Sequence, residues 1–126
     1  MAIELDHFIV PCRDQAASAQ RLGELLGVPW AAQSAVGPFS PVYVNDGLTL
    51  DFIQTDEQFP VHHYCFRVTR LEFDAIRARI QAAAIPYRST VRGPVDYKVD
   101  PRYGNIYWNE PDGHMWEILT VSYARR

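Results

Sequence analysis

The stretch "DGHMWEI" at residues 112–118 decides the fold of this chain, because an earlier stretch, "DGLTLDF" at residues 46–52, repeats its pattern. In each, an Asp-Gly pair is followed by a carboxylate that stands among apolar residues, Glu117 in the one and Asp51 in the other. An Asp-Gly pair between two apolar-alternating runs is a strong signal for a β-hairpin. The sequence therefore predicts two hairpins, each with a carboxylate in its second strand.

A strand and a helix precede each hairpin. Apolar alternation predicts one strand at residues 5–11 and another at residues 61–68. Capping and periodicity signals predict a helix over residues 15–26, and the spacing of Thr69 and Glu72 predicts a capping box at the start of a second helix. The order strand, helix, hairpin thus occurs twice, which makes the chain an internal repeat.

The two copies align residue by residue. His7 matches His63, and Asp51 matches Glu117. The offset is 56 residues at the histidines and 66 at the carboxylates, so the second copy has ten extra residues, which lie within residues 89–105. Gly-Pro and Asp-Pro pairs keep this insertion out of regular structure. It is either a solvated loop or a lid over a site.

The composition argues against several classes of function. The chain has 126 residues, 48% of them hydrophobic, which is enough to close one core, so we expect a single domain. A net charge of -3 gives no electrostatic case for binding nucleic acid or an anionic membrane. No apolar segment is long enough to span a membrane, and the N-terminal residues lack a basic leader. We expect a cytoplasmic protein that acts on a small molecule.

Strand periodicity predicts where the polar side chains point, since alternate residues lie on opposite faces of a sheet. The apolar rows of the first strand of each copy suit packing against the helices, so His7 and His63 face the other way. Glu117 and Asp51 also fall on the face away from the helices. If residues 46 and 47 form a two-residue turn, Val42 lies opposite Asp51.

Each of these residues also has an ordinary interpretation. A lone histidine is more often hydrogen-bonded than metal-bound, and this applies to His62 and His114. A lone carboxylate could be an edge charge that discourages aggregation. Two carboxylates and two histidines matched through one repeat favour a metal site, because an ionised carboxylate among apolar neighbours is costly unless it is paired.

The segments "LDHFIV", "HHYCFRV" and "EPDGHMWEIL" resemble the strands that identify the vicinal oxygen chelate superfamily of glyoxalases, bleomycin-resistance proteins and extradiol dioxygenases. The resemblance implies an α+β fold of two βαβββ modules, residues 1–56 and 57–126. The modules would form a cup-shaped, barrel-like mixed sheet with the helices outside. It also implies a homodimer in which each site combines modules from two subunits.

The same resemblance implies a ligand set of His7, His63 and Glu117 for one divalent metal per site, Fe, Mn, Ni or Zn. Asp51 stands where some members place a further glutamate. An aspartate is one methylene shorter, so we expect Asp51 to act as a catalytic base rather than as a ligand. Within the insertion, Tyr103 or Tyr97 could supply a hydroxyl to the reaction.

The remaining site predictions concern substrate. Trp108 and Met115 are expected to line a mainly apolar cup, and Arg67 is expected to receive a carboxylate of the substrate. We expect a metal-dependent lyase or isomerase of the glyoxalase type, or a small ring-cleaving dioxygenase, acting on an oxygenated substrate that chelates the metal. The alternatives are a metal-free protein that binds an antibiotic-like ligand, and a fosfomycin-type enzyme that opens an epoxide.

Overall fold

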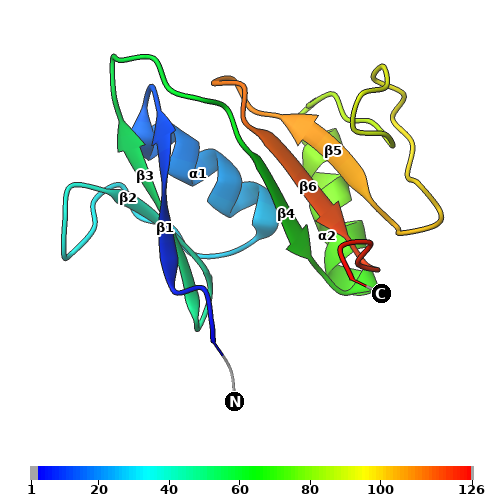
Figure 1. The fold of residues 1–126 in the computed structure, drawn as a ribbon, viewed down its shortest axis with the longest axis horizontal. Coiled ribbons are helices and arrows are strands. Elements are labelled where there is room, and N and C mark those ends of the chain that lie inside the picture. Colours follow the sequence, from blue (N-terminus) through cyan, green and yellow to red (C-terminus); the bar gives the residue numbers. More distant parts are fainter. Residues whose placement is uncertain (1–2, 126) are drawn as a thin grey trace. The chain divides into compact units, whose positions relative to one another are not determined.

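The computed structural model describes residues 3–125 and divides the chain into two compact units, Met1–Phe59 and Pro60–Arg126. Each unit has one helix and one three-stranded mixed sheet, as Figure 1 shows. The prediction of an α+β chain built from two repeated modules is therefore confirmed. None of the helices within residues 3–125 is long and apolar enough to cross a membrane.

The first unit contains four elements in the predicted order: β1 (His7–Cys12), α1 (Gln15–Leu26), β2 (Ser40–Asn45) and β3 (Leu48–Gln54). The strand order in the sheet is β1-β3-β2, with β1 parallel and β2 antiparallel to the central strand. Because β1 and β3 are parallel, their connection must cross over, and α1 lies in that connection. The helix covers one face of the sheet and leaves the other face for polar residues.

Local signals explain the bounds of α1. Asp14 caps the N-terminus by accepting a hydrogen bond from the backbone N–H of Ala17. Gly27 ends the helix in the left-handed conformation, with φ of 72°. Gly23 is needed for another reason, because a Cβ there would lie 2.7 Å from the Trp30 ring. Trp30 therefore packs directly on the helix backbone and forms a single bridge to Val42 at the sheet edge.

The hairpin of the first unit contains a bulge that shifts its register. Asn45 pairs with Leu48 as predicted, but Tyr43 rather than Val44 pairs with Thr49. The prediction that Val42 lies opposite Asp51 is therefore wrong, because Val42 pairs with Leu50. The residues of the turn have no positive φ, so the turn is not one of the primed types that match strand twist, and an extra residue restores the pairing.

The second unit repeats the arrangement with β4 (His63–Arg67), α2 (Arg70–Ala82), β5 (Ile106–Asn109) and β6 (Met115–Leu119). Its strand order is β4-β6-β5, again one parallel and one antiparallel pair. The predicted capping box is present in full, with Thr69 and Glu72 each accepting from the backbone of the other. Figure 1 shows α2 behind this sheet, where its buried residues Phe73, Ile76 and Ile80 contribute to the core.

An aromatic cluster fills the core of the second unit. Trp116 is 1% exposed and stacks on Tyr64 and Phe66, with ring centroids 4.7 and 6.0 Å away. Trp108 pairs with Trp116 across the β5–β6 ladder and is also 1% exposed. Residues directly opposite in a ladder share a face, so Trp108 lies on the buried, helix side of the sheet. The prediction that Trp108 lines a substrate cup is wrong.

The insertion at residues 89–105 contains no strand or helix within the described chain, as predicted, but its contacts with the unit are specific. Arg88, immediately before it, forms a single bridge to Tyr107 beside β5, just as Trp30 does beside β2 in the first unit. Asp96 accepts hydrogen bonds from both the backbone and the hydroxyl of Ser89. Near its end, Asp100 and Asn105 form a further bridge.

Candidate metal and substrate site

The two units place their histidine and carboxylate in the same register. In the first unit His7 pairs with Thr49, and the next residue on that face of β1 pairs with Asp51. In the second unit His63 pairs with Met115, and Cys65 pairs with Glu117. Each histidine therefore shares a sheet face with its carboxylate, offset by one step along that face. We call His7 with Asp51 the first half-site and His63 with Glu117 the second half-site.

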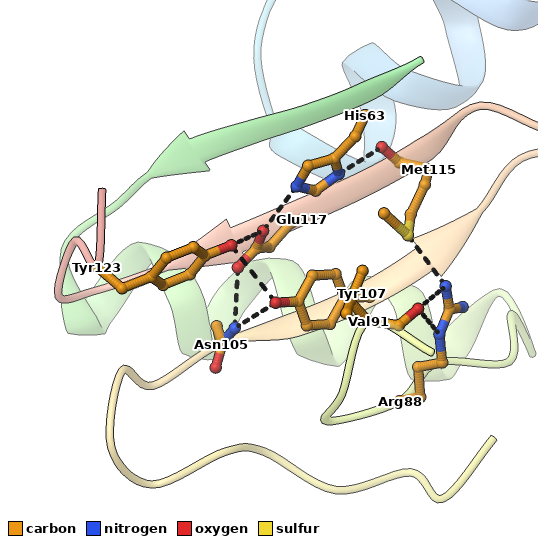
Figure 2. Close-up of polar contacts among 8 residues, drawn as sticks. All are labelled: His63, Arg88, Val91, Asn105, Tyr107, Met115, Glu117 and Tyr123. Atoms are coloured by element: carbon orange, nitrogen blue, oxygen red, sulfur yellow. Dashed lines mark hydrogen bonds and ion pairs between the residues drawn. The ribbon is translucent and has the colours of Figure 1, made fainter. Parts of the chain in front are cut away.

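Glu117 is a fully buried carboxylate in a complete hydrogen-bonded setting, drawn in Figure 2. His63 Nε2 lies 2.9 Å from Oε1, and the Tyr123 hydroxyl donates to the same oxygen at 2.6 Å. Asn105 Nδ2 donates to the other oxygen, Oε2, at 2.8 Å. A carboxylate without water is costly unless donors surround it, and here they do.

A hydrogen bond to the backbone of Met115 fixes the orientation of the His63 ring. Its Nδ1 lies 3.2 Å from the carbonyl oxygen of Met115, which can only accept, so Nδ1 carries the hydrogen. Nε2 is then the atom that faces Glu117. Either a proton lies between Nε2 and Oε1, or both atoms present lone pairs to a cation. In the second state Nε2 and Oε1, which lie 2.9 Å apart, would be two of the atoms that hold a divalent metal.

Asn105 and Tyr107 support the second half-site from its inner side. Asn105 is 2% exposed, and its Nδ2 also lies 3.2 Å from the Tyr107 hydroxyl. Its Oδ1 is buried without a hydrogen-bond partner in the described chain. Burial raises the pKa of the Tyr107 hydroxyl, and the nearby Glu117 raises it further. Tyr107 therefore stays protonated and can act as a donor.

The first half-site is more open. His7 Nδ1 lies 2.7 Å from the Asp6 carboxylate, and this hydrogen bond raises the pKa of His7, with a smaller contribution from Asp51. Asp51 is only 9% exposed, yet no hydrogen bond to its carboxylate is found among residues 3–125. Burial raises the pKa of Asp51, and the charge of His7 lowers it in part. Unlike Glu117, Asp51 is a largely buried carboxylate to which no side chain of the described residues donates a hydrogen bond.

The donor set fits a divalent metal. Histidines that bind a metal usually donate the other ring N–H to a carboxylate or a backbone carbonyl, as His7 does to Asp6 and His63 does to Met115. Both histidines can thus present Nε2 together with an adjacent carboxylate. Across residues 3–125, no group of three or more potential ligands lies close enough to hold an ion. Each unit supplies two potential ligands, a histidine and a carboxylate, so neither unit alone provides the three or four protein ligands of a typical site.

The other predicted site residues lie at different places. Met115 is on the Glu117 face and touches the guanidinium of Arg88 through its sulfur, 3.1 Å from Nη2. Arg67 is at the end of β4 on the His63 face and is exposed. His62 and His114 are outside the half-sites, as expected, because His114 Nδ1 accepts from the backbone of His62.

The tyrosines of the insertion have different surroundings. The ring of Tyr103 lies edge-on to that of Tyr123, with 5.1 Å between the ring centroids. Tyr103 therefore contacts Tyr123, which in turn contacts Glu117. Tyr97 instead packs against Tyr87, whose hydroxyl accepts hydrogen bonds from two residues of α2. Tyr97 thus belongs to the helix side of the unit and is not near Glu117.

Sequence reasoning missed four residues that contact Glu117 or lie on its face: Asn105, Tyr107, Arg88 and Tyr123. Asn105 is the last residue of the insertion, and no periodicity signal could have placed its amide against Glu117. Tyr107 pairs directly with Glu117 across β5 and β6, and correct hairpin parity would have found it. Arg88 lies 6.0 Å over the Tyr107 ring and bonds Asn109, which places a cation on this face. Tyr123 follows the last strand, and no periodicity signal could have placed it.

Cys65 also lies beside Glu117 but is not a nucleophile. Although the residue as a whole is exposed, burial of its thiol and the adjacent Glu117 carboxylate raise the pKa of Cys65 to about 12. The reactive form of a cysteine is the thiolate, which is scarce at neutral pH for such a group. Covalent chemistry at Cys65 is therefore disfavoured.

Comparison with solved structures identifies close relatives. Oxidase ChaP-H2 is 34% identical with a TM-score of 0.86, and the match covers 98% of this chain and 97% of that one. Oxidase ChaP-H1 is 36% identical with a TM-score of 0.84, covering 98% and 100%. A glyoxalase/dioxygenase from Nostoc punctiforme is 21% identical with a TM-score of 0.70, covering 94% and 91%, and shares the fold. No protein-family model and no curated protein sequence matches the chain.

Proposed function

The chain belongs to the vicinal oxygen chelate superfamily, and on that premise we propose that it is a metal-dependent oxidase of a small oxygenated organic compound. Two relatives that are more than 30% identical over nearly their whole length are named oxidases. The substrate would present two adjacent oxygens, the arrangement that chelates a metal with open coordination positions. An aromatic diol or hydroxyketone has this character.

The observation that carries the proposal is the shared geometry of the two half-sites. In both, the histidine Nδ1 is held by an oxygen acceptor, and a buried carboxylate stands at the equivalent step of the neighbouring strand. A duplicated core has no structural reason to preserve this arrangement on the face away from both helices. We therefore assign His7, His63 and Glu117 as the residues that would hold one divalent ion.

The roles of the surrounding residues follow from their chemistry. A metal held by two imidazoles and a carboxylate would supply Lewis acidity to the two substrate oxygens and, if it is iron, redox chemistry with O₂. Arg88 supplies a positive charge on the same face as Glu117, suited to a polar substituent of the substrate. Met115 provides apolar contact beside it. Asn105 and Tyr123 each donate to one oxygen of Glu117, so Glu117 is suited to a fixed ligand rather than to proton transfer.

Asp51 is suited to proton transfer. Its carboxylate is buried, has no hydrogen-bond donor in the described residues, and has a raised pKa, which brings it nearer to that of a substrate hydroxyl. We assign Asp51 as the base that removes a proton from the substrate. The hydroxyl of Tyr103 remains a further candidate for a substrate hydrogen bond.

The division of donors between two modules supports a homodimer in which module one of one subunit meets module two of the other. Two single variants, His7→Ala and His63→Ala, test this when they are mixed and allowed to exchange subunits. A mixed dimer of this kind would regain one intact site, so about a quarter of the wild-type metal sites should return on random exchange. No recovery of metal binding, or a monomer that binds metal fully, contradicts the dimer.

The function itself is tested by metal analysis followed by turnover. Protein purified without chelator should contain a divalent metal, and the apo protein reconstituted anaerobically with Fe²⁺ should consume O₂ with a member of a catechol and hydroxyquinone panel. Protein that takes up none of Fe²⁺, Mn²⁺, Ni²⁺ or Zn²⁺ would instead support the metal-free binding alternative. The preserved histidine orientations disfavour that outcome.

A further inference from the structure

Tyr123 reaches the second half-site from outside the sheet. It follows β6 by four residues, in a segment without regular structure, and its hydroxyl donates to Glu117 Oε1 at 2.6 Å. Figure 2 shows its ring on the opposite side of Glu117 from Met115 and beside the Tyr107 and Asn105 side chains. The oxygen that it contacts is the same one that faces His63 Nε2. Tyr123 therefore acts on the atom of Glu117 that would bind a metal.

The insertion fixes the position of the segment that carries Tyr123. The carbonyl oxygen of Tyr103 accepts three hydrogen bonds from this segment, from the backbone and hydroxyl of Thr120 and from the backbone of Val121. The rings of Tyr103 and Tyr123 are in edge contact as well. The extra residues of the second module therefore have a structural role, because they hold the Tyr123 side chain against Glu117.

The effect on Glu117 is orientational. Asn105 holds Oε2 from the buried side, and Tyr123 occupies one lone pair of Oε1. The other lone pair of Oε1 is then aimed along the direction of His63 Nε2. The carboxylate oxygen can only accept, so the Tyr123 hydroxyl is the donor of this hydrogen bond. Asp51, the equivalent of Glu117, has no such donor in the first unit as described.

We propose that Tyr123 is a positioning residue that holds Glu117 as a one-oxygen metal ligand, with the Tyr103 carbonyl as its anchor. The proposal rests on the metal site proposed above. It goes beyond that site because it assigns a function to the insertion and to the segment after β6, which together position Glu117. It also predicts that the carboxylates of the two modules differ in function: Glu117 is a fixed ligand, whereas Asp51 accepts no hydrogen bond from the described residues.

The test compares Tyr123→Phe with Tyr97→Phe in the full-length apo protein reconstituted with Co²⁺. Both changes remove one phenolic hydroxyl, but the Tyr97 ring packs on Tyr87 away from Glu117. We expect Tyr123→Phe to bind Co²⁺ about 10- to 100-fold more weakly, as is usual when a partner of a metal ligand is lost. The visible absorption bands of bound Co²⁺ should also shift, while Tyr97→Phe should match wild type in both.

A second variant, Thr120→Val, keeps the proposal testable if Tyr123→Phe fails to fold. Thr120→Val keeps the shape of the side chain but removes one of the donors to Tyr103. It should weaken Co²⁺ binding in the same direction by a smaller factor. Unchanged Co²⁺ affinity and spectrum in Tyr123→Phe and Thr120→Val, with wild type binding normally, overturn the positioning role alone. Wild-type protein that binds no Co²⁺ overturns the metal site together with it.

Discussion

Replacing Glu117 by Gln should separate metal binding from stability. The amide has the shape of the carboxylate, so its carbonyl can accept from Asn105 and its NH₂ can donate to His63 Nε2, whose Nδ1 keeps the hydrogen bonded to Met115. The Tyr123 hydroxyl, which donates to Oε1 in wild type, must rotate to accept from this NH₂ or bond water instead. Each charge-assisted hydrogen bond lost is worth about 1.5–3 kcal/mol, but burying the ionised group costs several kcal/mol. These terms nearly cancel. We expect the free energy of unfolding of the apo variant to lie within about 1 kcal/mol of wild type.

The same substitution should remove most of the stabilisation by metal. With free metal at about 100 times the Kd, wild type gains about 2.7 kcal/mol, and a variant with 100-fold weaker affinity gains only about 0.4 kcal/mol. For a domain of this size the wild-type gain corresponds to roughly 10 °C in Tm. Thermal unfolding with and without Zn²⁺ measures both quantities.

Glu117→Ala is the matched comparison. It leaves a cavity and removes the nearer of the two acceptors of the buried Asn105 amide, whereas His63 and Tyr123 are partly exposed and can bond water. We expect a loss of about 3–5 kcal/mol in the apo protein. The reasoning is refuted if Zn²⁺ raises the Tm of Glu117→Gln as much as that of wild type, or if the Gln variant is no more stable than the Ala variant.

Substitutions elsewhere in the chain have the following expected outcomes. Asp51→Asn should keep metal binding near wild type while lowering kcat by roughly 10² to 10⁴; loss of metal in this variant would make Asp51 a ligand. Burial raises the pKa of Asp51, so its contribution to the free energy of unfolding is fully present below the ordinary pKa of 3.8 and is lost as pH rises through the raised pKa. In urea unfolding, the stability of Asp51→Asn relative to wild type should therefore increase from acid to neutral pH. His7→Ala should remove most metal affinity in calorimetry and His62→Ala should not, and the reverse result would place the ligand elsewhere. Thr69→Ala should lower the unfolding free energy by about 1 kcal/mol through loss of the cap, with activity retained. Tyr103→Phe should lower turnover if its hydroxyl contacts substrate, and unchanged steady-state kinetics would remove that role.

The parts of the fold that depend on local signals could be predicted from the sequence. The α1 helix has the bounds expected for it, because Gly27 stops it within one residue. The capping box at Thr69 and Glu72 sets the start of α2 in the same way. The register of the histidines and carboxylates was also predictable, since it follows from alternation within strands and from the repeat.

Features that depend on loop conformation could not be predicted. The bulge beside Tyr43 arises from the conformation of the hairpin turn, and an Asp-Gly pair alone does not specify it. The sheet face on which Trp108 lies depends on whether the connection between β5 and β6 has an odd or an even number of residues. Because the last pair of this hairpin is Asn109–Met115, Trp108 pairs with Trp116 and shares its face. Tyr123 was missed because its segment is anchored by a backbone carbonyl, which every residue has.

The uneven placement of the three tryptophans makes the two modules separately visible to fluorescence. Trp30 packs on α1 in the first unit, whereas Trp108 and Trp116 are both buried in the second. In Trp30→Phe, all tryptophan emission comes from the second unit, so its change in urea follows the unfolding of that unit alone. Comparison with far-ultraviolet circular dichroism, which follows both helices, then reports whether the duplicated modules unfold as one cooperative body or one after the other.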